Sequence, residues 1–133
     1  MNVQEVCKAL GESGCYFISL LKVVGREDDA IKLFRQALSQ GLIDEDCYVK
    51  NPSGLLSLAA GGAWSVRHEP ASYAPKGDEK EILRFERKVP MKTYAHFVVG
   101  DGSGKVAYDP LGKSMTVQSG TLQSKRIIKR GIA

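Results

Sequence analysis

The hydrophobic period of the chain changes at Gly61-Gly62. Before these glycines, apolar residues recur at i, i+3 and i+4, the spacing of an amphipathic helix. After them, Trp64, Val66 and His68 alternate with polar residues, which is the pattern of a half-buried strand. Helices followed by strands predict an α+β fold, with N-terminal helices packed on a C-terminal antiparallel sheet.

The first half of the chain predicts four helices. We expect them at residues 2–10, 15–24, 30–38 and 55–60. Gly11 and Gly25 should end the first two, and Gly41 offers a left-handed cap to the third. Pro52-Ser53-Gly54 should open the fourth, because proline is tolerated in the first turn of a helix.

The second half predicts strands at 64–69, 82–85, 96–99, 105–109 and 126–129, with a loop over 70–80. Asp101-Gly102-Ser103-Gly104 between two of these strands is a strong hairpin signal. The last strand is rich in Lys and Arg, so we expect an edge strand whose charges prevent pairing with other chains. A nucleic-acid patch is the alternative reading of those charges. Residues 1–133 should form a single domain.

The composition and charge of the chain argue against several classes of protein. The chain has a formal net charge of +4, and 43% of its residues are hydrophobic, as in ordinary globular proteins. No apolar run approaches the roughly 18–20 residues of a membrane span. The N-terminus is unlike a secretory signal, so we expect a cytoplasmic protein without membrane contact. Binding of nucleic acid is not expected, and the oligomeric state stays open.

The three cysteines are too few and too scattered to predict a disulfide framework or a zinc site. We therefore expect no metal and no cofactor. Cys7 lies in an apolar helical stripe, and Cys7 and Cys47 are both interpreted as core residues. His68 is interpreted as structural, because it shares a strand face with Trp64 and Val66.

Cys15 has two readings. Gly14 permits a sharp turn, so Cys15 is expected in the first turn of the buried helix. There the helix dipole and free backbone N–H groups favour a thiolate, as in many cysteine nucleophiles. The alternative is a small buried hydrophobic residue.

His96 and Asp109 are expected to meet across the hairpin. A loop centred on Gly102-Ser103 pairs Val98 with Ala107 and His96 with Asp109. A carboxylate on one imidazole nitrogen fixes the tautomer and leaves the other nitrogen to act as a base. The alternative is a cross-strand polar pair on a solvated face.

Three short blocks carry a resemblance to a known family: Ser13-Gly14-Cys15-Tyr16-Phe17, Tyr94-Ala95-His96-Phe97-Val98-Val99 and Val106-Ala107-Tyr108-Asp109-Pro110-Leu111-Gly112. In order and type they resemble the papain-like cysteine peptidases. The closest pattern is that of the bacteriocin leader-processing (double-glycine) peptidases and their small bacterial and phage relatives. The resemblance implies a peptidase acting on a peptide or protein, with Cys15 as nucleophile, His96 as general base and acid, and Asp109 as orienting partner.

The chain departs from the family pattern at the oxyanion position. The family places a glutamine about six residues before the nucleophile, where this chain has Ala9. Gln4 and Ser13 are the candidates to replace it as hydrogen-bond donors to the oxyanion. The alternative is a catalytically weak or inactive papain-like domain that binds a partner protein.

Overall fold

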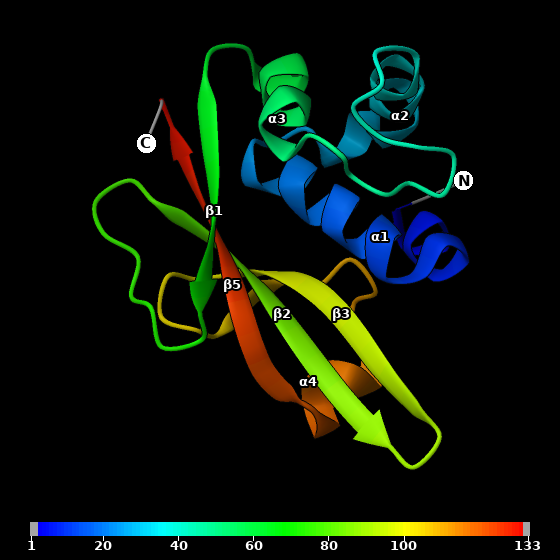
Figure 1. Ribbon diagram of the computed structural model, residues 1–133, viewed down its shortest axis with the longest axis vertical. Coiled ribbons are helices and arrows are strands. Elements are labelled where there is room, and N and C mark those ends of the chain that lie inside the picture. Colours follow the sequence, from blue (N-terminus) through cyan, green and yellow to red (C-terminus); the bar gives the residue numbers. More distant parts are fainter. Residues whose placement is uncertain (1–2, 132–133) are drawn as a thin grey trace.

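The computed structural model describes the backbone of residues 3–131 and the side chains of residues 13–131. Four helical segments come first: α1 (Val3–Val23), the 3-10 turn η1 (Glu27–Asp29), α2 (Ala30–Ser39) and α3 (Pro52–Ala60). Five strands follow, with one short helix before the last: β1 (Trp64–Pro70), β2 (Lys80–Val89), β3 (Lys92–Gly100), β4 (Val106–Tyr108), α4 (Met115–Ser119) and β5 (Thr121–Arg130). The expected α+β fold, with N-terminal helices and a C-terminal antiparallel sheet, is confirmed (Figure 1).

The last strand lies inside the sheet, so the expectation of an edge strand is wrong. The strand order is β1-β5-β2-β3-β4, which gives β5 a neighbour on each side. Its charged side chains have partners on neighbouring elements: Lys125 pairs with Glu81 at 2.7 Å, and the guanidinium of Arg126 lies over the ring of Phe97. Charged side chains keep a strand from pairing with other strands only when the charges have no partners. Here Lys125 and Arg126 both have partners within the sheet.

Helix α1 extends through Gly11 and Gly14, where the sequence predicted a break between two helices. A glycine inside a helix costs only about 1 kcal/mol relative to alanine. Packing outweighs that cost, because Phe17, Leu20 and Leu21 are fully buried and Phe17 packs edge-on against Phe34 of α2. Cys15 therefore lies well inside the helix and not in its first turn.

The two faces of the sheet have different neighbours. Ile82, Phe97 and Ile128 belong to the same apolar core as α1, α2 and α3. The residues next to them in sequence point the opposite way, since side chains alternate along a strand. On that second face α4 packs against β2 and β3.

Strands β2 and β3 extend beyond the rest of the sheet as a two-stranded ribbon (Figure 1). The β2–β5 pairing ends at Glu86, whereas β2 and β3 stay paired up to Val89 and Lys92. β2 ends just before Pro90, four residues beyond the predicted strand 82–85.

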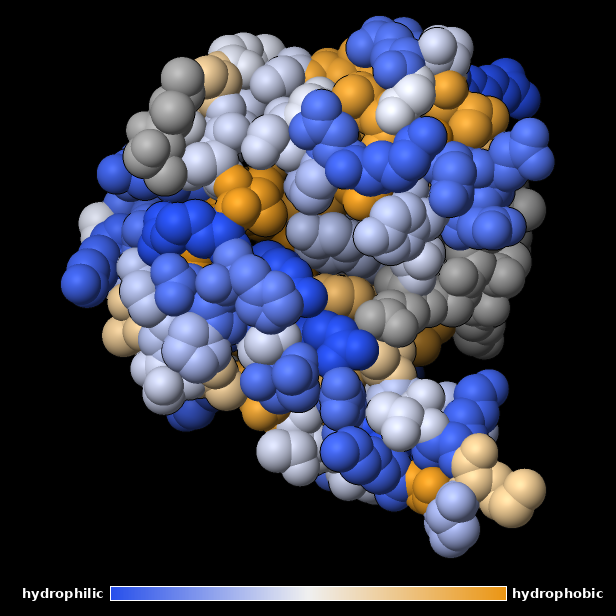
Figure 2. Space-filling model, in the orientation of Figure 1, coloured by the Kyte–Doolittle hydropathy of each residue, from blue (hydrophilic) through white to orange (hydrophobic). Residues whose placement is uncertain are grey.

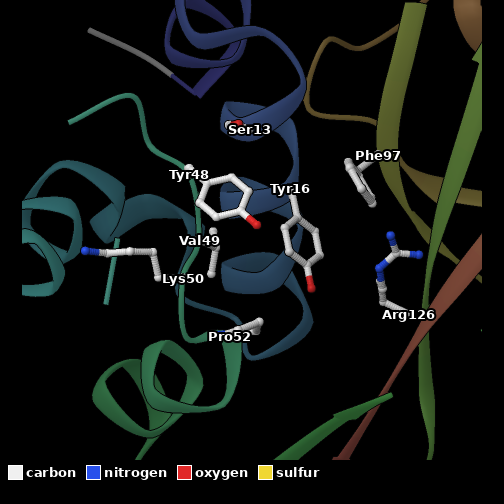
Figure 3. Close-up of a pocket in the computed structure, with 8 residues that line it drawn as sticks. All are labelled: Ser13, Tyr16, Tyr48, Val49, Lys50, Pro52, Phe97 and Arg126. Atoms are coloured by element: carbon white, nitrogen blue, oxygen red, sulfur yellow. The ribbon is translucent and has the colours of Figure 1, made fainter. Parts of the chain in front are cut away.

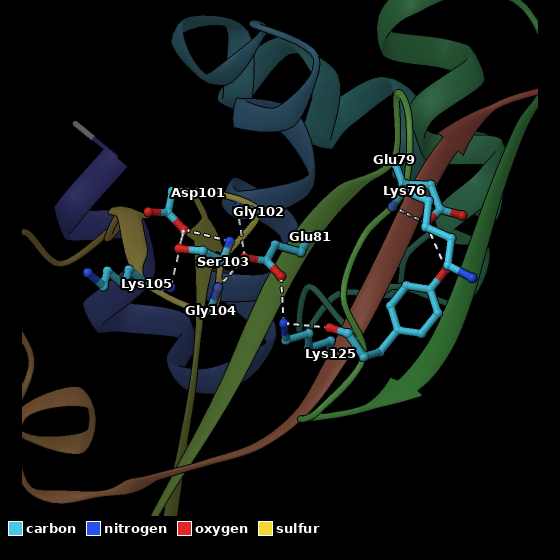
Figure 4. A network of polar contacts seen from close by, with 10 residues as sticks. Lys76, Glu79, Glu81, Asp101, Gly102, Ser103, Gly104, Lys105 and Lys125 are labelled. Carbon is cyan, nitrogen blue, oxygen red and sulfur yellow. Dashed lines mark hydrogen bonds and ion pairs between the residues drawn. The ribbon is translucent and has the colours of Figure 1, made fainter.

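One buried carboxylate and its lysine partner hold a turn and a loop against the sheet (Figure 4). Oε2 of Glu81 accepts hydrogen bonds from the backbone N–H groups of Gly102 and Gly104, at 2.8 and 2.9 Å. Its other oxygen accepts from Nζ of Lys125, which also donates to the carbonyl oxygen of Tyr73. This ion pair thus fixes the 101–104 turn and the 71–79 loop to the sheet.

Candidate functional site

His96 and Asp109 form a buried pair. Nε2 of the imidazole lies 2.6 Å from Oδ1 of the carboxylate, and the two side chains are 4% and 6% exposed. A charge-assisted hydrogen bond of this length is strong, and little water competes with it at this burial. The expected contact between the two residues is confirmed.

His96 and Asp109 are not directly opposite each other on paired strands. The structure pairs Val99 with Tyr108 and Gly100 with Val106, with a bulge between the two pairs. This bulge shifts the register, and the predicted pairing of Val98 with Ala107 is therefore wrong. Strand β4 ends at Tyr108, one residue before Asp109. Asp109 reaches His96 from a tight turn instead.

That turn fixes the carboxylate. Oδ1 of Asp109 also accepts the backbone N–H of Leu111, at 2.8 Å, and the backbone oxygen of Asp109 accepts the N–H of Gly112. Burial acts to raise the pKa of Asp109. The hydrogen bonds from His96, Leu111 and Ser114 outweigh burial and hold this pKa below its ordinary value. The carboxylate is therefore ionised at neutral pH.

Ser114 connects the pair to α4, a helix that the sequence analysis missed. The Ser114 side chain caps α4 by accepting the N–H of Val117. The available signal was a serine directly before Met115, since serine is a preferred N-cap. Five residues are too few to show helical periodicity.

Cys15 differs from its expected state in two respects. It lies in the interior of α1, where backbone amides are bonded within the helix, so the dipole argument for a thiolate fails. Its sulfur is held in a disulfide bond, and the residue is 2% exposed. The sequence predicted no disulfide framework and left this single bond unforeseen, because spacing along the chain does not reveal which sulfurs meet in space.

Helix α1 nevertheless directs Cys15 towards the part of the sheet that holds His96. Cys15, Ser19 and Lys22 share one helix face at i, i+4 and i+7. Oγ of Ser19 donates to the carbonyl oxygen of Phe97 at 3.4 Å, and Nζ of Lys22 lies 4.9 Å from the ring centroid of Tyr108. The face thus lies against the residues that adjoin His96 and Asp109.

Cys15 precedes Ser19 by one helical turn, on the face of α1 that meets β3. Side chains alternate along a strand, so the imidazole of His96 points to the sheet face opposite the Phe97 ring, which contacts α1. A contact between Cys15 and His96 therefore has to form around the edge of β3, which β4 pairs only at Val99 and Gly100.

Of the two oxyanion candidates, only Ser13 has a side chain within the described residues. The side chains of Gln4 and Ala9, like that of Cys7, lie outside the described residues. Ser13 lies on another face of α1, because residues at i and i+2 of a helix do not face each other. The structure thus brings His96 and Asp109 together, but not Ser13 and Cys15.

Ser13 lines a cavity of about 500 Å³ between α1, the 48–52 segment and the sheet. Figure 3 shows Tyr16 of α1 between Tyr48 and Phe97, with Arg126 on the sheet side. The ring centroids of Tyr16 and Phe97 are 4.6 Å apart. Burial raises the pKa of Tyr16 to about 12, although Arg126 opposes the shift, so the hydroxyl is neutral at ordinary pH. The cavity combines aromatic walls with a cationic group.

Cys47 lies in the core, whereas His68 lies at the surface beside Arg126. Nη1 of Arg126 donates to Nε2 of His68 at 3.1 Å. Burial lowers the pKa of His68, and the nearby guanidinium groups of Arg126 and Arg84 lower it further. Cys47 is a free, fully buried thiol, which confirms its place in the core. Burial, assisted by Asp44, raises its pKa to about 12.

No helix among residues 3–131 is long and apolar enough to span a membrane. Comparison with curated proteins and with solved structures gave no match. One family does match, described as "Protein of unknown function, DUF261", over residues 2–130. The match covers nearly the whole chain, including α1, the His96–Asp109 pair and all five strands, and the protein is thereby a member of the DUF261 family.

Proposed function

We propose that the chain is a papain-like, thiol-dependent hydrolase of amide or thioester bonds, in which the reduced form of Cys15 is the nucleophile. The observation that carries the proposal is the buried 2.6 Å contact between His96 and Asp109, on a strand, β3, that contacts the helix carrying Cys15. A carboxylate in this position holds the imidazole in one tautomer and stabilises its protonated form. The substrate class is a peptide or protein.

The chemistry begins with reduction of the disulfide by a thiol. The released Cys15 Sγ–H transfers its proton to Nδ1 of His96, since Nε2 is held by Asp109. The thiolate attacks the carbonyl carbon, and the imidazolium then protonates the leaving amine or thiol. Water, deprotonated by the same imidazole, hydrolyses the acyl-enzyme and returns Cys15 to the thiol form. No metal or cofactor takes part in these steps.

The cytoplasm is the compartment that fits this proposal. Cytoplasmic thiol systems keep most protein cysteines reduced. Reduction would release Cys15 there, and the disulfide form would be the inactive, oxidised state of the same chain. The proposal thus accounts for a nucleophile that is covalently blocked in the structure.

The test uses p-nitrophenyl acetate, an activated ester that acylates a reactive thiolate without knowledge of the natural substrate. We expect the reduced protein to release a burst of p-nitrophenolate close to one equivalent and to carry one acetyl group on Cys15. His96→Ala should slow acylation by about 10²–10⁴-fold, the usual contribution of a general base. Cys47→Ser is the matched control and should keep the burst. A burst that survives Cys15→Ser would contradict the proposal.

A second candidate function is binding without catalysis, as an inactive domain that recognises a partner protein. The observation that favours it is the disulfide at Cys15, together with the 500 Å³ cavity on another face of α1. In that case Cys15→Ala should retain the partner that wild type captures, whereas Tyr16→Ala, which alters the cavity wall, should release it. Loss of the partner on Cys15→Ala alone would count against this candidate.

A further inference from the structure

The projecting ribbon of β2 and β3 has an apolar tip. Met91 at the turn is 95% exposed, and Val89 next to it is 38% exposed. Exposed single apolar residues are common, but this pair occupies the far end of an arm that leaves the body of the protein (Figure 1). Figure 2 shows apolar and hydrophilic surfaces meeting on the projecting lower end of the molecule.

Cations lie directly behind the tip. Residues 87–95 contain Arg87, Lys88 and Lys92 and no carboxylate. Arg87 and Lys92 both lie over the ring of Tyr94, with 4.5 and 4.8 Å between the charged group and the ring centroid. Strand pairing puts Arg87 opposite Tyr94 and Val89 opposite Lys92, so one face of the ribbon combines two cations with two apolar residues.

An apolar residue at the very tip, followed by cations along the ribbon, suits a membrane surface. Moving inward from the tip, Met91 comes first, then Val89 opposite Lys92, then Lys88, and then Arg87 opposite Tyr94, which is 38% exposed. A bilayer approached from this side would place hydrocarbon around the tip and anionic headgroups beside the lysines. Tyrosine is enriched at such interfaces, since it has an apolar ring and a polar end.

From this arrangement we propose that the β2–β3 hairpin binds the surface of a bilayer that contains anionic lipid, with Met91 inserted and Arg87, Lys88 and Lys92 beside the lipid phosphates. The contact is peripheral and independent of the chemistry at Cys15. It differs from the expectation, drawn from the sequence, of a chain without membrane contact.

The shape of the ribbon favours a bilayer over other anionic partners. A narrow convex tip can be surrounded by fluid lipid on all sides, whereas a protein would need a pocket that fits it. A nucleic acid would engage the cations but offers no apolar layer for the foremost residues, apart from an opened base step. The small contact, two apolar side chains and three cations, predicts reversible binding that weakens in salt.

The experiment is sedimentation of the full chain with vesicles of phosphatidylcholine, with and without about one third phosphatidylglycerol. We expect binding only to the anionic vesicles, and its loss at high salt. Met91→Ser should weaken binding by about tenfold, the effect of one buried apolar side chain. Replacing Lys88 and Lys92 by glutamine should weaken it by at least as much, because each cation near an anionic surface contributes about fivefold.

Control variants at other positions test whether vesicle binding depends on this hairpin or only on surface charge and exposed apolar residues in general. Met115→Ser, at a methionine that is 58% exposed on α4, and the pair Lys32→Gln and Lys129→Gln should bind like wild type. Met91→Trp should shift its emission to shorter wavelength only with anionic vesicles. Equal binding to both kinds of vesicle, or wild-type binding by Met91→Ser, would overturn the proposal. So would binding to duplex DNA without binding to vesicles.

Discussion

The two cysteines described by the structure have very different surroundings. Cys47 is enclosed by the helical core and has a φ of 65°, a conformation that few residues other than glycine adopt. Cys15 lies on the helix face that meets β3. At the scale of single residues, the function proposed here depends on Cys15 alone becoming reactive after reduction.

Cys47 should therefore resist alkylation in the folded protein. Burial holds its pKa at about 12, so almost no thiolate exists at pH near 8. We expect mass spectrometry of the reduced, folded protein treated with iodoacetamide to find Cys47 unmodified, and to find it modified after unfolding in guanidinium. Rapid labelling of Cys47 in the folded state would contradict the structure.

Glu79 should contribute to stability above mildly acidic pH. The backbone N–H of Lys76 and the hydroxyl of Tyr73 lower its pKa to about 2, with help from Arg67. Because the folded pKa lies below the unfolded value of about 4.3, this stabilisation is present above that value and is lost as pH falls towards 2. In urea unfolding, Glu79→Gln should flatten the decline of stability between these limits. An unchanged decline would refute the assignment.

At the scale of elements, loops are fixed to the sheet by groups that the sheet itself buries. Glu81 and Lys125 are 1% and 3% exposed and hold the 101–104 turn and the 71–79 loop. The turn leads into β4 and so to Asp109. The position of the orienting carboxylate thus depends partly on this ion pair.

Breaking the ion pair from one side should be costly. The Lys125→Met variant would leave the buried carboxylate of Glu81 without its cationic partner. This should lower the free energy of unfolding by about 3–5 kcal/mol. The double variant Glu81→Gln with Lys125→Met removes both charges and should regain part of that loss. Denaturant titration measures the free energy of unfolding of the single and the double variant. A double variant less stable than Lys125→Met would contradict this account.

Gly120, between α4 and β5, should not tolerate a side chain. A Cβ there would lie 2.2 Å from the backbone oxygen of Thr116 and 2.4 Å from that of Glu86. Neither backbone group can move without displacing α4 or β2, so Gly120→Ala should cost about 3 kcal/mol or more. Gly41→Ala is the control: its φ of 72° with open space around it predicts only the strain of about 1–2 kcal/mol. Equal costs would be inconsistent with the packing of α4.

At the scale of the whole molecule, the fold class could be predicted because the change of period at Gly61-Gly62 is a local signal. The place of β5 could not, since Glu81 and Phe97, which Lys125 and Arg126 contact across the sheet, lie 44 and 29 positions away along the chain. The His96–Asp109 contact could be predicted from hairpin spacing, but its bulged register could not. The disulfide at Cys15 and the short α4 needed the three-dimensional structure.

In the proposed hydrolase, reduced Cys15 and His96 act as a pair. The rate of iodoacetamide labelling of Cys15 against pH in the reduced protein, in wild type and in His96→Ala, tests this pairing. We expect a plateau of reactivity that extends well below the ordinary thiol pKa of about 8.5 and disappears in His96→Ala. If Cys15 instead reacts as an ordinary or buried thiol in both proteins, the hydrolase is excluded and the binding function remains.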